Sequence, residues 1–504
     1  MPQFASSSIF KLTGIIFILC ICAHVTVLGQ SPDSAQTKYL AEMKTTGSAF
    51  SGPFQKNFVQ NYALPEKAFL AKMDSARATF LTVLAHYQKE LKPDFAKQQE
   101  QVINYYIDKL VIDYPNNYNI CTGKAFPYES DITRRLKHYL PDFNNPALIN
   151  NPAFRDYAKA FFSFQLVYEL KKPAYIGIDN RALHAILNVI PRFVTNAKCR
   201  AFWQYDYLYN HINTNGIKNI EKIYSHFITT CPDTAYISRI KGLYTTDHKG
   251  RQGHIIRTYK TAGPYKLDMH IFLPDSGIKG KKKQVMVYFH AGNWQSGKPD
   301  QFFGACKADA RKGWVACAVE YRLHDRQGSL PFEAVKDARS AIRWLRQHAV
   351  EFNIDTSKIV ASGYAAGGHL ALTCAMANKY NEQTDNLHYS PAPNLIMVTS
   401  GIYDLTDINT AWIRKDLKNK DEVKDITPNY LVKAGMPHIL IIHGTADGYA
   451  SYTSAKFFES QMVKVKNQLS FHSFKGAGHF LWLEPKYSTN AEQDQQAFLK
   501  KNGY

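Results

Sequence analysis

Short stretches in the second half of the chain hold the residue types that acyl-transfer chemistry uses. The stretch HGTAD (443–447) carries an aspartate, and GAGH (476–479) ends on a histidine. Upstream of both, between two apolar runs, lies SGYAAGGH (362–369), whose glycines allow a very tight turn. An acid and then a histidine follow the turn along the chain. In this order the acid can orient the imidazole, which can then serve as a general base.

The turn has the G-x-S-x-G spacing of a nucleophile elbow, where a strand bends sharply into a helix. Its central position, which holds the attacking hydroxyl in that pattern, is Ala365. Alanine has no hydroxyl, so the covalent serine mechanism cannot run at this position. The start of the following helix would still favour negative charge in the turn.

Two neighbouring side chains and a water molecule are the alternatives to the missing nucleophile. Ser362 precedes the turn on the strand, so we expect its hydroxyl to be buried away from His479. Tyr364 is adjacent to the position, but its side chain points elsewhere in an elbow of this kind. A water activated by His479 would leave only the acceleration of about 10³–10⁴-fold over water that such sites keep without their nucleophile.

A further stretch, HAGNWQSG (290–297), follows an apolar run that predicts a strand. Its small residues would let backbone N–H groups point into a cleft, where they could meet a developing oxyanion. We expect His290 and His443, each at the end of a predicted strand, to be hydrogen-bonding residues rather than catalysts. His369 is expected to pack at the start of the helix after the turn.

From about residue 254 to the C-terminus, predicted strands alternate with predicted helices. The apolar runs predict strands at 265–273, 285–290, 314–320, 358–362, 395–400, 438–443 and 469–474. Helices are predicted at 331–352, 367–378 and 451–466. Apolar strands separated by helices imply an α/β fold with a mostly parallel sheet covered on both faces. Ligands bind such sheets at the carboxyl ends of the strands, which is where the stretches above lie.

Residues 254–504 resemble the acetyl-esterase/lipase group of the α/β-hydrolases, near its hormone-sensitive-lipase-like and feruloyl-esterase-like members. The matching segments follow one another along the whole region, and they are HAGNWQSG, EYRL (320–323), PFEAVKDARSAIRWLRQHA (331–349), GYAAGGHLA, HGTAD and GAGH. The resemblance implies the α/β-hydrolase fold. It also implies a Ser–Asp–His triad that hydrolyses carboxylic esters, often acetyl or aromatic esters on sugars.

Carried over by motif, the resemblance makes Asp447 the acid and His479 the base, with Ala365 in place of the family's serine. It also implies an oxyanion hole of backbone N–H groups, formed by Gly292 and Ala366 with help from Ala291 or Asn293. Ala291 stands where the family usually has glycine, and its methyl group could narrow the approach of the backbone to a ligand.

Aromatic residues near these stretches could line a substrate pocket. We place Trp294 and Tyr364 in such a pocket, and Trp412 and Trp482 are further candidates, although a tryptophan alone is more often a core residue. The ligand expected from the resemblance is a small ester or an acylated sugar.

Three functions are consistent with these residues. The first is an ester hydrolase whose reaction is strongly impaired or lost. The second is a non-catalytic binding module for acylated sugars or small esters, and the third is a scaffold in the cell envelope. The sequence does not distinguish a natural alanine at 365 from one introduced to trap a substrate complex.

The region before the hydrolase-like part is predicted to be helical. Apolar residues recur at helical spacing over 65–91, 98–112 and 151–170, and aromatic residues are frequent. These aromatics predict a helical bundle with an aromatic core, and an aromatic sugar- or peptide-binding groove is the alternative. We therefore expect a helical domain at 30–245, a polar linker at 246–253 and an α/β-hydrolase domain at 254–504.

Residues 1–29 have the pattern of a secretory signal peptide. Lys11 is followed by an apolar run that ends at Gly29, before polar residues begin. We expect cleavage after Gly29, export to the periplasm or the outside, and no stable membrane insertion afterwards. An uncleaved N-terminal anchor is the alternative, although His24 interrupts the run.

Charge and cysteine content exclude several other classes of protein. The chain has 61 Lys and Arg against 42 Asp and Glu, a net charge of +19, but no nucleic-acid recognition motif, so we expect no nucleic-acid partner. Its eight cysteines form no CxxC pair and no zinc spacing. We expect no metal and no organic cofactor, and one unassigned disulfide in the N-terminal half is conceivable.

Overall fold

The computed structural model describes residues 34–124, 126, 130–275, 277–415 and 417–504. The predicted signal peptide lies outside these residues. Within these ranges, no helix is both long and apolar enough to cross a bilayer. The six cysteines of this part of the chain are all free thiols, so the disulfide considered for the N-terminal half is not formed among the described residues.

The chain divides into two compact units. One runs up to Tyr175 and includes 182–210 and 225–240, and the other comprises 176–181, 211–224 and 241–504. The predicted linker at 246–253 is wrong over 246–250, because helix α11 (Thr234–Gly250) continues to the end of this stretch. The sheet-containing unit therefore takes in short segments of the helical region that precedes the sheet.

The region before the sheet is helical, as predicted. Its α-helices are α2 (Ser34–Lys56), α3 (Phe58–Tyr62), α4 (Glu66–Tyr87), α5 (Pro93–Thr122), α6 (Asp131–Leu136), α7 (Pro152–Glu169), α8 (Arg181–Phe193), α9 (Ala197–Asn215), α10 (Glu221–Thr230) and α11. Aromatic side chains fill the interior, since Phe154, Phe162 and Trp203 are each at most 1% exposed. The ring centroids of Phe162 and Trp203 lie 5.3 Å apart. These aromatics form a core, and not the alternative open groove.

The second unit contains one eight-stranded sheet, in the order β1-β2-β4-β3-β5-β6-β7-β8. β2 pairs antiparallel with β1 and β4, and all other pairs are parallel. The strands are β1 (Ile255–Ala262), β2 (Tyr265–Phe272), β3 (Lys283–Phe289), β4 (Val315–Val319), β5 (Ile354–Tyr364), β6 (Leu395–Thr399), β7 (His438–Gly444) and β8 (Leu469–Phe474).

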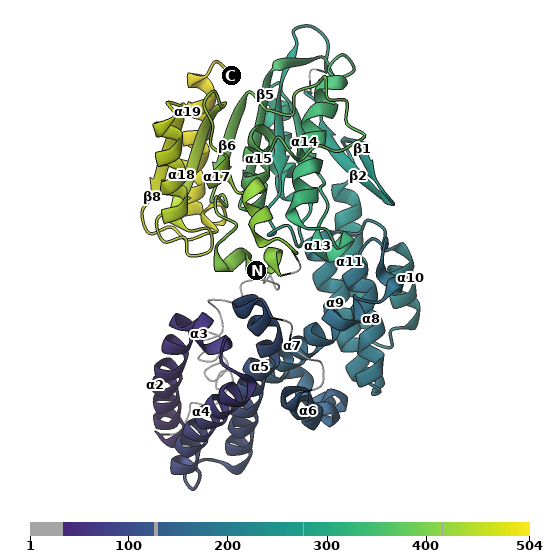
Figure 1. The fold of residues 1–504 in the computed structure, drawn as a ribbon. Coiled ribbons are helices and arrows are strands. Elements are labelled where there is room, and N and C mark those ends of the chain that lie inside the picture. The colour runs from purple at the N-terminus through teal and green to yellow at the C-terminus, as the bar shows by residue number, and fades with distance from the viewer. Residues whose placement is uncertain (1–33, 125, 127–129, 276, 416) are drawn as a thin grey trace. The chain divides into compact units, whose positions relative to one another are not determined.

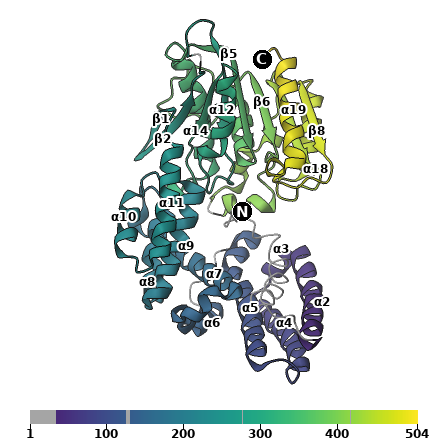
Figure 2. The same cartoon turned by 180° about the vertical axis from the view of Figure 1, so that it is seen from behind.

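Helices cover both faces of this sheet, which makes the predicted α/β fold with a mostly parallel sheet the observed one (Figures 1 and 2). One face packs against α14 (Pro331–Gln347), α15 (Ala366–Met376) and α18 (Tyr452–Lys464). The other face packs against α12 (Phe303–Arg311) and α19 (Pro485–Lys501). Both helices are labelled in Figure 2, which views the molecule from behind. The shorter helices of the unit are α13 (His324–Gln327), α16 (Ala411–Arg414) and α17 (Pro428–Leu431).

The register of the parallel strands brings their carboxyl ends to one edge of the sheet. Phe289 of β3 pairs with Gly363 of β5, and Tyr364 pairs with Thr399 of β6. On the other side, Gly444 of β7 pairs with Phe474 of β8. The loops that follow these strands therefore start side by side, and they contain the stretches that the sequence singled out.

Candidate active site

Ala365 lies at the sharp bend between β5 and α15, as the elbow pattern predicts. Its backbone has φ 50° and ψ −115°. Residues other than glycine rarely adopt this region, which costs about 1–3 kcal/mol. The Ala365 N–H donates to the carbonyl oxygen of Thr399 at 3.1 Å, and the residue is 4% exposed. The chain thus keeps the strained backbone of an elbow around a methyl group.

Close backbone contacts explain the glycines on either side of the bend. A Cβ at Gly367 would lie 1.9 Å from the carbonyl oxygen of Phe289, at the end of β3. A Cβ at Gly363 would lie 2.4 Å from the carbonyl carbon of Gly367. Atoms cannot approach so closely, so α15 can begin directly behind β3 only because both positions lack a side chain.

We expect Gly367→Ala to lower the free energy of unfolding of the sheet-containing unit by about 2 kcal/mol or more, since the added methyl meets backbone that cannot rotate away. Gly304→Ala is the matched control. Gly304 is an exposed residue of α12, and no described atom lies within 4 Å of a Cβ built there. The control should be neutral or stabilise by up to about 1 kcal/mol. Denaturant unfolding followed by tryptophan fluorescence measures both variants, and equal stabilities would contradict the close packing at Gly367.

Asp447 and His479 meet at the carboxyl ends of β7 and β8. Nδ1 of His479 lies 2.9 Å from Oδ2 of Asp447, and both residues are buried. A Cβ at Gly444 would lie 2.3 Å from the carbonyl oxygen of Ala477. The loop after β7 can therefore pass the loop after β8 only with glycine at this position. The structure therefore brings together the acid and the histidine that the sequence paired.

The carboxylate of Asp447 is held on both oxygens. Oδ1 accepts hydrogen bonds from the N–H groups of Tyr449 and Ala450, each at 2.9 Å. Oδ2 faces His479 and, at 3.3 Å, Nε2 of His443. Burial alone would raise the pKa of Asp447, but the hydrogen bonds from His443 and His479 outweigh it and hold the pKa well below its usual range. Asp447 is therefore an ionised acceptor that orients His479 through Nδ1.

Three aromatic rings surround the imidazole of His479. The ring centroids of Tyr449, Phe480 and Trp482 lie 4.7, 5.0 and 5.5 Å from that of the imidazole. Because Nδ1 is bound to Asp447, Nε2 is the nitrogen that remains for proton transfer. It has no hydrogen-bond partner among the described residues. We call the rings of Phe480, Trp482 and the neighbouring Tyr364 the aromatic wall.

Tyr364 joins this wall through Trp482. The two rings stack with centroids 4.9 Å apart and planes at 20°. The ring of Tyr364 also packs against that of Phe302, with centroids 4.7 Å apart. Burial raises the pKa of Tyr364 to about 12. The phenol therefore stays protonated at neutral pH and does not supply an ionised nucleophile.

Residues 290–298 form the loop after β3, which we call the 290–298 loop. The N–H groups of Gly292 and Asn293 donate to no acceptor among the described residues, and the two residues have φ 131° and 55°. In contrast, the N–H of Ala291 donates to Oε1 of Gln301 at 2.7 Å. The predicted help of Ala291 in an oxyanion hole is wrong for this reason, since its donor is already used. No signal in the sequence pointed to Gln301.

Ala366 is the first residue of α15. The N–H groups in the first turn of a helix have no acceptor within the helix, and they lie at the positive end of its dipole. Free N–H groups therefore occur both at the start of α15 and in the 290–298 loop, at residues Ala366, Gly292 and Asn293.

Trp294 does not line an open pocket. It is 0% exposed, and its ring lies edge-on to that of His369, with centroids 4.8 Å apart and planes at 87°. Its backbone has φ 56°. The prediction that places Trp294 in a substrate pocket is wrong because the side chain is enclosed in the core.

A family model described as BD-FAE matches residues 269–462. The matched segment runs from β2 into α18 and contains the bend at Ala365, the 290–298 loop and Asp447. The chain contains an α/β-hydrolase of the esterase superfamily.

Individual relatives match part of this hydrolase. Esterase LipC of Mycobacterium tuberculosis is 27% identical over 218 residues, which cover 40% of this chain and 53% of LipC. The kynurenine formamidase of Danio rerio is 28% identical over 167 residues, or 33% of this chain and 51% of the relative. The chain thus spans about half the length of these relatives. A propionate-bound structure of an esterase from Thermogutta terrifontis is 31% identical, with a TM-score of 0.47, and covers 50% of this chain and 96% of its own.

Two serine residues of the hydrolase lie close to the bend at Ala365 and could in principle replace the missing nucleophile. Ser362, on β5, is 2% exposed, and Ser400, directly after β6, is 0% exposed. Ser362 is buried as the sequence predicts. Because both residues are enclosed, neither presents a hydroxyl that could take the place of the missing one.

Two buried histidines of the hydrolase lie next to the candidate site. Nδ1 of His290 lies 2.8 Å from the carbonyl oxygen of Ala291, and Nε2 of His369 lies 2.7 Å from that of Ile426. Burial lowers the pKa of each to about 4, so both are neutral at pH 7. They are hydrogen-bonding residues of the core, as expected from their positions.

The low pKa values of His290 and His369 predict a loss of stability in mild acid. Both lie below the unfolded value of about 6.5, so the unfolded chain takes up protons first as the pH falls. We expect the hydrolase to lose up to roughly 3 kcal/mol per histidine between about pH 6.5 and 4. Denaturant midpoints measured over this range should fall with pH, and His369→Gln should flatten the fall. His388→Gln, a change at an exposed residue, is the control. An unchanged slope in His369→Gln would contradict the assignment.

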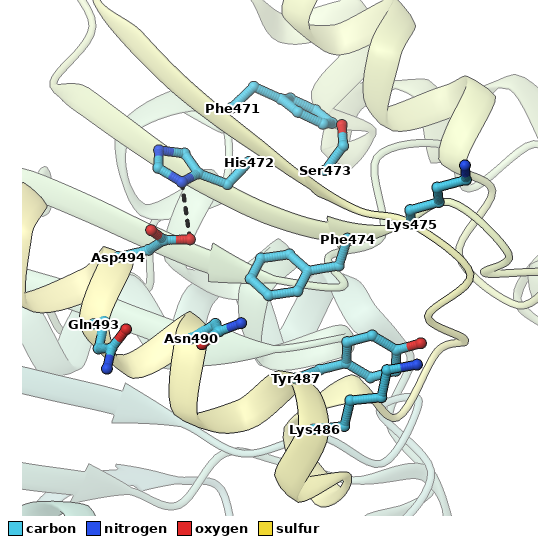
Figure 3. A pocket seen from close by; sticks show the side chains of 10 residues that line it. All are labelled: Phe471, His472, Ser473, Phe474, Lys475, Lys486, Tyr487, Asn490, Gln493 and Asp494. Carbon is cyan, nitrogen blue, oxygen red and sulfur yellow. Dashed lines mark ion pairs between the residues drawn. The ribbon is translucent and has the colours of Figure 1, made fainter.

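A shallow groove of about 770 Å³ lies elsewhere on the hydrolase, between β8 and α19 (Figure 3). It holds a second acid–imidazole pair, since Nδ1 of His472 lies 2.9 Å from Asp494. Both side chains are partly exposed, at 40% and 31%, and neither follows a strand end beside the bend. No group of three or more metal-ligating side chains occurs in the described part of the chain.

Proposed function

We propose that this chain is a carboxylic ester hydrolase whose turnover is strongly impaired, because Ala365 occupies the position of the nucleophile. One observation carries the proposal: the backbone at Ala365 keeps φ 50° and ψ −115° although no hydroxyl is present to be displayed. The Asp447–His479 pair and the free N–H groups support the same reaction. In a serine protease with such a triad, removal of the serine alone costs about 10⁶-fold in kcat.

The chemistry that remains would use water. Nε2 of His479 would take a proton from a water that attacks the ester carbonyl carbon, and Asp447 would stabilise the imidazolium. The N–H groups of Gly292, Asn293 and Ala366 would donate to the oxyanion. When the tetrahedral species collapses, the C–O bond to the alcohol breaks and His479 returns the proton to the alcohol. The products are the acid and the alcohol, and no acyl-enzyme forms.

The ligand that we propose is a small carboxylic ester or an acylated sugar. The aromatic wall offers apolar and stacking surface beside His479, which suits an acyl group or a sugar ring. Binding without turnover is the second candidate function. The missing hydroxyl at Ala365 favours it, since a ligand held beside His479 would meet no covalent nucleophile at this position.

Hydrolysis of a chromogenic acetate ester by the unaltered protein and by Ala365→Ser tests the proposal. We expect turnover far below that of ordinary enzymes in the unaltered protein and a large gain in the variant. A kcat within the ordinary range of about 1–10³ s⁻¹ for the unaltered protein would overturn it. Calorimetric binding of an acetylated sugar, without a gain in Ala365→Ser, would favour the second candidate.

A further inference from the structure

The position of the free N–H groups in the 290–298 loop depends on how the loop closes on itself. A Cβ at Gly292 would lie 1.8 Å from the carbonyl oxygen of Ser296, and a Cβ at Gly297 would lie 2.4 Å from that of Ala291. The beginning and the end of the loop are therefore in direct backbone contact. Any movement of Gly297 would shift the backbone at Gly292 and Asn293.

Two residues from the helices before the sheet hold the end of this loop. Asn215, the last residue of α9, accepts a hydrogen bond on Oδ1 from the N–H of Gly297 at 3.2 Å. Asp247, in the last turn of α11, accepts one from Nζ of Lys298 at 2.6 Å. Asn215 is 8% exposed, and the side chain of Asp247 is 7% exposed, so water competes little for either contact.

A second connection reaches the middle of the loop through α13. The N–H of His324 donates to the carbonyl oxygen of Trp294 at 2.9 Å, and the N–H of Asp325 donates to that of Gln295 at 3.0 Å. These bonds use the N–H groups at the start of α13, and they fix the loop between Asn293 and Ser296.

α13 is in turn held by Asp179, which also precedes the sheet. The carboxylate of Asp179 accepts hydrogen bonds from the guanidinium of Arg326 at 2.6 Å and from Nε2 of Gln327 at 2.8 Å. Arg326 is 6% exposed, so the pair is largely shielded from water. Residues 176–181, 211–224 and 241–250 thus all contribute a contact to the loop or to its support.

We propose that Asn215 is a positioning residue, which acts through the N–H of Gly297 to hold the Gly292 and Asn293 N–H groups where a developing oxyanion would lie. The short segments before the sheet are then part of the functional hydrolase. A chain that begins at residue 254 would lack the contacts that hold the oxyanion-hole N–H groups in position. The inference rests on the proposed function in one respect only, namely that these N–H groups serve ester hydrolysis.

The kinetic test uses Ala365→Ser as the parent, because we expect the unaltered protein to turn over too slowly. Adding Asn215→Ala should lower kcat by about 10–100-fold with little change in KM, since a displaced oxyanion donor is felt in the transition state. Asn215→Asp keeps an oxygen acceptor for Gly297 and should restore kcat to within about threefold of the parent. Lys222→Ala, an exposed residue of the same segment, is the control and should leave both constants unchanged. Equal kcat in Asn215→Ala and the parent would overturn the proposal.

Hydrogen exchange gives a readout that does not depend on activity. In the otherwise unaltered chain, Asn215→Ala should speed exchange of peptides covering 290–298 by about tenfold, and Asn215→Asp should not. Unchanged protection in Asn215→Ala would overturn the inference. If Ala365→Ser proves inert while exchange rises as expected, the proposed function fails and the positioning of the loop stands. Far-UV circular dichroism on each variant identifies a general loss of folding, which Asn215→Asp is not expected to show.

Discussion

Replacing Ala365 by serine is expected to raise the rate of ester hydrolysis by about 10³-fold or more. The backbone at this position already has the φ and ψ of a nucleophile elbow, and the substitution adds a single oxygen atom to an existing Cβ. The general base is oriented by an ionised carboxylate, and N–H donors are free in the loop after β3. Hydrolysis of p-nitrophenyl acetate, compared between the two proteins, measures the gain.

Ala365→Gly is the matched control for this gain. It relieves the positive φ at the bend without adding a hydroxyl, so it should leave hydrolysis at the level of the unaltered protein. An increase in the glycine variant similar to that in Ala365→Ser would mean that strain, and not the missing oxygen, limits the reaction. That result would contradict our account of the site.

The second large effect is expected from the acid–imidazole pair in the Ala365→Ser background. Asp447→Asn should lower kcat by about 10⁴-fold, because an amide in place of the carboxylate no longer fixes the tautomer of His479. His479→Ala should cost a similar amount. The pKa of Asp447 is held well below its usual range, so the carboxylate stays ionised between about pH 5 and 9 and its protonation cannot limit the rate there.

A second acid–imidazole pair in the same unit supplies the control for these variants. His472 and Asp494 lie 2.9 Å apart in the groove between β8 and α19 (Figure 3). His472→Ala should leave kcat and KM of the Ala365→Ser protein unchanged. A loss in His472→Ala comparable to that in His479→Ala would show that the reaction uses the groove instead, and would contradict the assignment of Asp447 and His479.

The elements that hold the site were predictable from the sequence to different degrees. All seven predicted strands are present, and five of them, β3 to β7, are of the buried parallel kind that apolar runs flanked by helices identify well. β1 was missed because it is a partly exposed edge strand, and its polar residues, such as Arg257 and Lys260, mask the pattern. The linker was misplaced because polar residues at 246–250 form the exposed end of a helix as readily as a loop.

The site was predictable where a motif specifies a whole turn, and not where single contacts decide. The strained bend at Ala365 and the pairing of Asp447 with His479 follow from glycine spacing and chain order. The burial of Trp294 and the capture of the Ala291 N–H by Gln301 depend on how the 290–298 loop folds in three dimensions. No local pattern encodes such contacts.

Labelling with a fluorophosphonate probe tests the central claim most directly, because this reagent bonds covalently to an activated hydroxyl beside a histidine base. We predict no adduct on the unaltered protein and one adduct at position 365 in Ala365→Ser, located by mass spectrometry of the digested chain. Rapid labelling of the unaltered protein at Tyr364, Ser362, Ser400 or any other residue around His479 would contradict the account. It would show that the site holds an activated nucleophile although position 365 has no hydroxyl.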